Sequence, residues 1–114
     1  MIAVTFNANA TLAGLFLGGD SGTLGLGPDN LFIHMTGMSD LGWKGAKDAG
    51  AQVSLAVPIE MNMRHGTPPI QKALDLGFEP SLSTDVECVL AADIFSQMRA
   101  AMALQRMFLN GLAL

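Results

Sequence analysis

The feature that most constrains the fold of this chain is a repeat with a period of 27 residues. The segments "DAGAQVSL", residues 48–55, and "DLGFEPSL", residues 75–82, share Asp, Gly, Ser and Leu at four matched positions. A fixed period of this kind is typical of a supersecondary unit that occurs more than once in a chain. Because the chain has only two copies, the alternative interpretation is a chance similarity. We expect the two segments to form the same local structure.

Each copy carries the signals of a helix that is followed by a strand. "SDLGWKGAKDAG" begins with Ser39, a good N-cap, and ends with Gly50, which suits the position after a helix. "PPIQKALDLG" begins with proline, which is favoured in a first turn, and ends with Gly77. The short runs "AQVSLAV" and "FEPSLS" then have the length of buried strands. Strands that alternate with helices favour a parallel sheet with right-handed crossovers.

The same pattern extends along the chain and predicts four strand–helix units in a single α/β domain over residues 1–114. The expected strands are residues 2–6, 31–34, 52–57 and 79–83, and the expected helices are residues 39–49, 68–76 and 92–111, with a further short helix over "TLAGLFLGG". "PIEMNMRHGT" is expected to be a loop. The last helix carries Met98 and Met102 in an apolar stripe, which we expect to pack against the core.

The composition argues against a nucleic-acid partner and bears on how the apolar surface is covered. The six Lys and Arg are scattered and the net charge is −4, whereas nucleic-acid binding needs a clustered basic footprint. Only 14% of the residues are charged, against about 25% in ordinary soluble domains. Half of the residues are apolar, so either the chain is unusually buried or a partner covers part of its apolar surface.

The sequence also indicates a cytoplasmic location. The apolar run around "ATLAGLFLGG" is too short to span a bilayer, and no basic segment precedes the N-terminal apolar residues. We therefore expect neither a membrane span nor a signal peptide. The single cysteine, Cys88, excludes an internal disulfide and is expected to be buried or half-buried.

The candidate site residues follow the predicted strands. In parallel βα folds, ligands bind at the C-terminal ends of the strands. His34 follows "LFI", Asp85 follows "PSLST", and both Glu60 and His65 lie in the loop after the third strand. A histidine there can be a ligand, a proton shuttle or a substrate contact. The alternatives are a purely structural strand-end histidine and a capping or turn role for Asp85.

At these residues the chain resembles a known family. "LFIHMTGMSDLGWKGAKDAGAQVSLAVPIEMNMRHGTPPIQKALDLGFEPSLSTDVE", with "DIFSQMRAAMALQR" further on, is similar to the amidohydrolase superfamily. The likeness is closest to its cytosine deaminase and chlorohydrolase-like branch, and it extends from Leu31 to Arg106. It depends on the combination of a strand-end His, a Val-Ser strand, a Glu loop with His-Gly, and a strand that leads into Asp.

The resemblance implies a parallel (βα)4 half of a TIM barrel, made of strands five to eight with their helices. The family reaction is deamination or dechlorination of a nitrogen heterocycle by water activated on one or two divalent metals, here zinc or iron(II). By resemblance, His34 contacts substrate or the metal-bound water, and Asp85 is a metal ligand and proton shuttle. Glu60 and His65 match a loop that faces the substrate.

Two departures from the family pattern bear on activity. The sequence contains no His-x-His pair, and Asn7, or alternatively Asn9, stands where the fifth strand of the family ends in a metal-binding histidine. Asparagine is a weak zinc ligand beside imidazole. We therefore expect a hydrolase-like fragment that is inactive as an isolated chain, so its standing as an enzyme is open.

The expected architecture also predicts self-association. A four-stranded half-barrel has two open edges and an apolar inner face, so we expect a homo-oligomer, in particular a dimer. Two other functions are compatible with the same sequence. One is a non-catalytic α/β binding module that uses the same strand ends for a ligand. The other is a truncated barrel that folds only by self-association.

Overall fold

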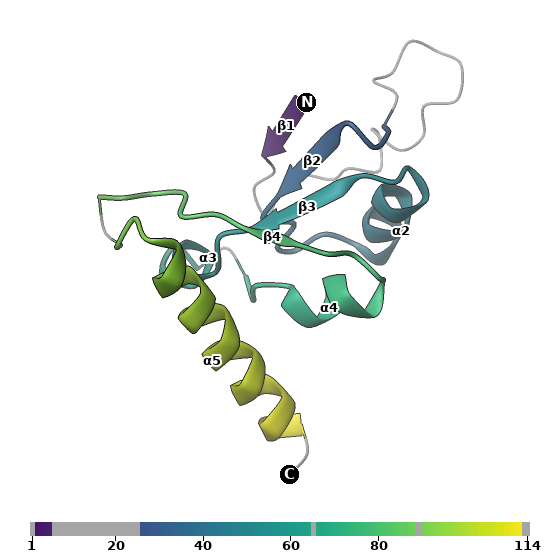
Figure 1. Cartoon of the computed structure of the whole chain (residues 1–114). Coiled ribbons are helices and arrows are strands. Elements are labelled where there is room, and N and C mark those ends of the chain that lie inside the picture. The colour runs from purple at the N-terminus through teal and green to yellow at the C-terminus, as the bar shows by residue number, and fades with distance from the viewer. Residues whose placement is uncertain (1, 6–25, 65, 89, 113–114) are drawn as a thin grey trace.

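The computed structural model describes residues 2–5, 26–64, 66–88 and 90–112. Its strands are β1 (Ile2–Thr5), β2 (Asn30–Ile33), β3 (Gln52–Leu55) and β4 (Ser81–Leu82). They form a parallel sheet in the order β1-β2-β3-β4 (Figure 1). The described helices are α2 (Asp40–Asp48), α3 (Val57–Asn62), α4 (Ile70–Asp75) and α5 (Ile94–Leu112). The predicted α/β class and the parallel strand order are confirmed, whereas the helix expected over "TLAGLFLGG" lies outside the described residues.

The two copies of the repeat occupy equivalent places in the fold. In the β3–β4 ladder, Ser54 pairs with Ser81 and Leu55 pairs with Leu82. The register between the two strands is therefore the same 27 residues that separate the copies in the sequence. Repeated residues lie side by side in space, so the repeat is a structural unit.

The two helix ends before these strands have the same hydrogen bonds. Gly50 has φ 72° and Gly77 has φ 75°, a left-handed conformation that glycine adopts without a steric penalty. In each copy the residue after the glycine donates its N–H to a carbonyl five residues back, Ala51 to Ala46 at 3.0 Å and Phe78 to Ala73 at 2.9 Å. This is the Schellman arrangement, which satisfies carbonyls that would otherwise be left over at a helix end.

The core fills the space between the sheet and the helices. Trp43 on α2 packs against Phe78 edge to face, with ring centroids 5.6 Å apart. Lys47 donates from Nζ to the carbonyl of Gly77 at 2.6 Å and lies over the Phe78 ring, which ties the first copy to the turn of the second. The remaining core residues come from the strands, from all four described helices and from the turns between them: Phe32, Met35, Ala46, Ala51, Val53, Leu55, Val57, Ala73 and Leu104.

Helix α5 packs differently from the prediction. It contacts α3, α4 and β4, and its buried residues are Gln97 and Leu104. Met98 and Met102 are 52% and 56% exposed, so the expectation that the methionine stripe packs in the core is wrong. The reason is that α5 has apolar residues around most of its circumference and a neighbour on one side (Figure 1).

Two further expectations are corrected. Residues 57–62 form helix α3, where a loop was expected. Pro58 lies in its first turn, where its missing N–H costs nothing. The carboxylate of Glu60 also accepts the N–H of Ala56, the residue that precedes the helix, at 2.8 Å. Cys88 is exposed, where a buried or half-buried side chain was expected. Within the described ranges, no helix has both the length and the apolar character needed to cross a bilayer.

The corrected packing of α5 predicts unequal effects for two substitutions that are two residues apart, on opposite faces of the helix. Leu104→Ala should lower the free energy of unfolding by about 2–3 kcal/mol because it removes a side chain from the core. In the monomeric chain, Met102→Ala should change it by no more than about 0.5 kcal/mol because that side chain is exposed. Urea unfolding followed by the fluorescence of the single tryptophan, Trp43, measures both. Equal losses would contradict this orientation of the helix.

Candidate functional site

Three of the predicted site residues meet at the C-terminal end of the sheet. His34 directly follows β2, Glu60 lies on α3 after β3, and Asp85 is the third residue after β4. The Nδ1 atom of His34 is 3.1 Å from Oε1 of Glu60. Its Nε2 atom is 3.7 Å from Oδ2 of Asp85. The imidazole therefore lies between two carboxylates.

Backbone pairing beyond the strands holds these residues in place. The N–H of His34 donates to the carbonyl of Ser54 at 2.9 Å, and the N–H of Ser83 donates to the carbonyl of Leu55 at 2.9 Å. The Oγ of Ser83 then accepts from the N–H of Asp85 at 3.2 Å. A serine two residues before the aspartate forms a local turn of the kind that Ser and Thr side chains support. The sheet thus sets the position of His34, and Ser83 sets that of Asp85.

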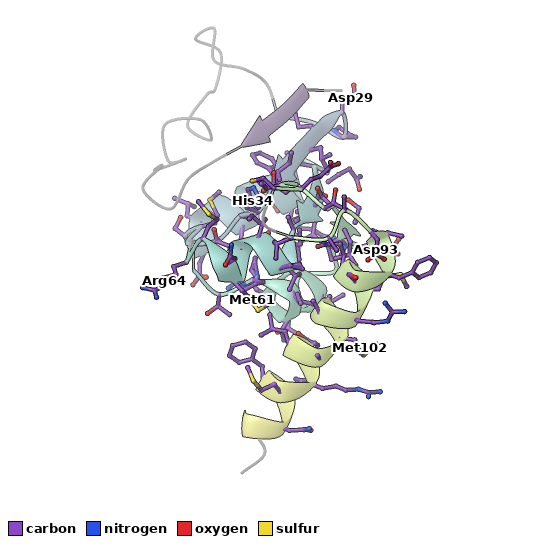
Figure 2. All side chains as sticks on the ribbon, turned by 90° about the vertical axis from the view of Figure 1, so that its left-hand side faces the viewer. Asp29, His34, Met61, Arg64, Asp93 and Met102 are labelled. Carbon is purple, nitrogen blue, oxygen red and sulfur yellow. The ribbon has the colours of Figure 1, made fainter. Side chains whose placement is uncertain are left out.

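The backbone at the site is unusual. His34 has φ 72° and Asp85 has φ 57°, in the left-handed region that few residues other than glycine occupy. Met35 and Arg64 also have positive φ, at 51° and 55°. Such conformations cost about 1–3 kcal/mol each and concentrate at functional sites. Arg64 points away from the body of the molecule, whereas His34 lies close to the sheet (Figure 2).

The three side chains differ sharply in exposure. Glu60 is fully buried and His34 is 6% exposed, whereas the Asp85 side chain is 36% exposed. Burial raises the pKa of Glu60, and the hydrogen bonds from Ala56 and His34 act in the opposite direction. The negative charge of Asp85 raises the same pKa further. Because Asp85 is the most exposed of the three side chains, solvent reaches the cluster from the Asp85 side.

The structure brings together His34, Glu60 and Asp85, as expected from the sequence. His65 and Asn7 lie outside the described residues. Glu60 differs from the expectation in its position. It lies in a helix, and its carboxylate is directed at His34 instead of the space where a substrate was expected. Sequence reasoning did not single out Ser83, although a serine two residues before an aspartate is a recognisable turn signal.

The described residues do not make a complete site for zinc or iron(II). Catalytic zinc takes three protein ligands and keeps one position for water. Nε2 of His34 and Oδ2 of Asp85 face a common space, but Glu60 lies at the opposite ring nitrogen and cannot share an ion with Nε2. Among the described residues, no group of three or more His, Cys, Asp or Glu side chains is placed to hold a metal ion.

Searches of protein-family models, curated proteins and solved structures find no match to this chain. The chemistry of the site therefore rests on its own geometry. Its clearest properties are an imidazole placed between two carboxylates and one of those carboxylates open to solvent.

The raised pKa of Glu60 predicts how stability varies with pH. The folded chain holds the Glu60 proton more tightly than the unfolded chain does, so this residue stabilises the fold below the ordinary glutamate pKa. That contribution is lost as the pH rises through the raised pKa. The free energy of unfolding of the wild type should therefore fall, relative to Glu60→Gln, as the pH is raised from acid to neutral.

Urea unfolding of both proteins across this range measures the difference. Asp40→Asn is a control of opposite sign, because the hydrogen bond and charge of Lys72 lower the pKa of Asp40. The stability that Asp40 contributes is lost as the pH falls. A difference between wild type and Glu60→Gln that does not vary with pH would contradict the burial of an ionisable carboxyl at this position.

Proposed function

We propose that this chain is an amidohydrolase-like half-barrel, equivalent to strands five to eight of the family's TIM barrel. In this proposal His34 and Asp85, at the C-terminal end of the sheet, contact the polar groups of a small nitrogen heterocycle. The family reaction would be hydrolytic deamination or dechlorination. The proposal is supported by the sequence resemblance, by the parallel strand order and by the position of both residues beyond the C-terminal ends of strands.

One observation carries the proposal: a buried imidazole stands between a buried carboxylate and a solvent-accessible one. An imidazole between two carboxylates has the geometry of a group that passes a proton from one neighbour to another. Asp85 is the group that an incoming molecule meets, because it is the most exposed of the three. Substrate contact and proton transfer are therefore the roles of His34 and Asp85.

The donor set limits what these residues do alone. His34 and Asp85 supply two donors, fewer than the three that catalytic zinc takes. We assign no metal-dependent step to them. Hydrolysis would need zinc or iron(II) donors in addition to the residues described, so the chain by itself is proposed to have little or no hydrolase activity.

Binding of a heterocycle at His34 and Asp85 can be tested by titrating the ¹⁵N-labelled chain with cytosine in NMR experiments. We expect shifts at His34 and Asp85, and at least a tenfold weaker response in His34→Gln and Asp85→Asn. Lys72→Ala, on the surface of α4, is the matched control and should bind as the wild type does. The absence of any shift at the strand ends would refute a binding role. Near-stoichiometric zinc or iron in protein purified without chelator would show that the donor set is complete after all.

A second proposal is self-association, which the exposed apolar surface of α5 favours. Large contiguous apolar patches are rare on soluble monomers and mark interaction surfaces. We propose that a second copy of the chain covers this surface, as expected from the open edges of a half-barrel. The apolar side chains of α5 that are more than two-fifths exposed are Ile94, Phe95, Met98, Met102, Met107, Phe108 and Leu109.

Sedimentation equilibrium tests this proposal. The wild type should sediment as a dimer at micromolar concentration, and Met102→Asp should raise the dimer dissociation constant at least tenfold because it places a charge in the apolar patch. Lys44→Ala, an exposed position on α2, is the control and should leave the constant unchanged. A stable, well-folded wild-type monomer at micromolar concentration would contradict the proposal.

A further inference from the structure

We propose that Gln97 on α5 accepts a hydrogen bond from the carboxyl group of Glu60 and thereby holds Glu60 as a neutral acid beside His34. Gln97 is then a positioning residue, because it acts on the site through Glu60. The inference rests on the proposed function only for the role of His34 in substrate contact. The charge of Glu60 itself depends on the contact between α3 and α5.

Two buried oxygens in this part of the molecule lack a partner. Among the described residues, Oε2 of Glu60 and Oε1 of Gln97 are the buried side-chain oxygens that make no hydrogen bond. Glu60 is fully buried and Gln97 is 1% exposed, so bulk water does not reach either oxygen. A buried polar atom without a partner is costly, and native structures contain few of them. We therefore expect a hydrogen bond at each of these oxygens.

The two oxygens belong to helices that pack together. Helix α3 carries Glu60, α5 carries Gln97, and the two helices contact each other (Figure 1). Further along α5, Gln105 donates to the side chain of Gln71 on α4, so the later turns of α5 face α4. The first turns of α5, which include Gln97, are therefore the part that faces α3. Both unpartnered oxygens then lie at the interface between α3 and α5.

A single proton on Oε2 of Glu60 gives both oxygens a partner. Two acceptor oxygens cannot bond to each other, whereas a protonated carboxyl group is a donor. The other oxygen, Oε1, already accepts from the backbone N–H of Ala56 at 2.8 Å and lies 3.1 Å from Nδ1 of His34. A proton on Oε1 would leave Oε2 and the Gln97 oxygen unsatisfied. The proton therefore belongs on Oε2, from which it is donated to Oε1 of Gln97.

The competing arrangement has an ionised Glu60. The amide of Gln97 would then be turned over, so that its nitrogen donates to Oε2 and its oxygen points elsewhere. The two arrangements differ in the sign of what Gln97 does. As an acceptor it stabilises the protonated acid, and as a donor it stabilises the carboxylate.

The charges around Glu60 favour the neutral acid. Burial raises its pKa most, and the negative charge of Asp85 raises it further, whereas the backbone hydrogen bond at the helix start and the contact with His34 lower it. The charged side chains of α5, Arg99 and Arg106, are exposed. With Glu60 neutral, the imidazole has one uncharged neighbour and one charged neighbour, Asp85.

Carbon-13 NMR of the glutamate carboxyl groups tests the proposal in the full chain. The chain has three glutamates, and the other two, Glu79 and Glu87, are exposed and serve as internal references. Glu60→Gln identifies the Glu60 signal by its loss. In a pH titration we expect Glu60 to stay protonated well above the ordinary glutamate pKa. Ionisation at or below that ordinary pKa would overturn the proposal.

Gln97→Met tests the role of Gln97, because it keeps the length of the side chain and removes the acceptor. It should lower the pKa of Glu60, with about a fivefold loss of proton affinity, as expected for one lost hydrogen bond. Gln105→Met, the same change on the same helix, is the matched control and should leave Glu60 unchanged, because Gln105 bonds to Gln71. A higher pKa of Glu60 in Gln97→Met would mean that the amide donates to a carboxylate, and an unchanged pKa would mean that the two groups do not interact. Either result overturns the proposal.

Far-ultraviolet circular dichroism checks that Gln97→Met folds. If it does not, Gln97→Asn, which withdraws the amide by one methylene, replaces it and should shift the pKa of Glu60 in the same direction. A wild-type chain that has a protonated Glu60 and does not bind cytosine would refute the proposed function alone. Cytosine binding by a chain in which Glu60 ionises at the ordinary pKa would refute this inference alone.

Discussion

The hydrogen bond between His34 and Glu60 is the interaction on which the site depends. It joins the end of β2 to the helix that follows β3, so it links two neighbouring βα units through their side chains. Both residues are buried, and in such surroundings a satisfied hydrogen bond is strong whereas an unsatisfied partner is costly. The first turn of α3 and the left-handed backbone of His34 are therefore parts of a single arrangement.

The site lies where the two copies of the repeat stop being alike. Up to Leu55 and Leu82 the copies share a helix end, a glycine turn and a strand. Three residues later the first copy has Pro58, inside a helix, and the second has Asp85, with a left-handed backbone. A common scaffold thus presents two different strand ends to the same space, one that carries the buried Glu60 and one that carries the exposed Asp85.

Local signals in the sequence predicted the scaffold well. The glycine turns, the parallel order and the meeting of His34 with Asp85 follow from short-range patterns and from the geometry of parallel sheets. The helix α3 did not follow, because in six residues the choice between helix and loop depends on a tertiary contact, here the hydrogen bond between His34 and Glu60. The exposure of Met98 and Met102 was also missed, since periodicity locates apolar residues on a helix without showing which of them meet a neighbour.

The register between β3 and β4 has a consequence for how such a chain can change in length. Each copy supplies its own helix end, turn and strand, and the offset between the paired strands equals the sequence period of 27 residues. Units of this kind interact mainly with their nearest neighbours, so their stabilities add approximately along the array. An in-frame duplication of one unit would then insert a strand into the sheet with both glycine turns unchanged.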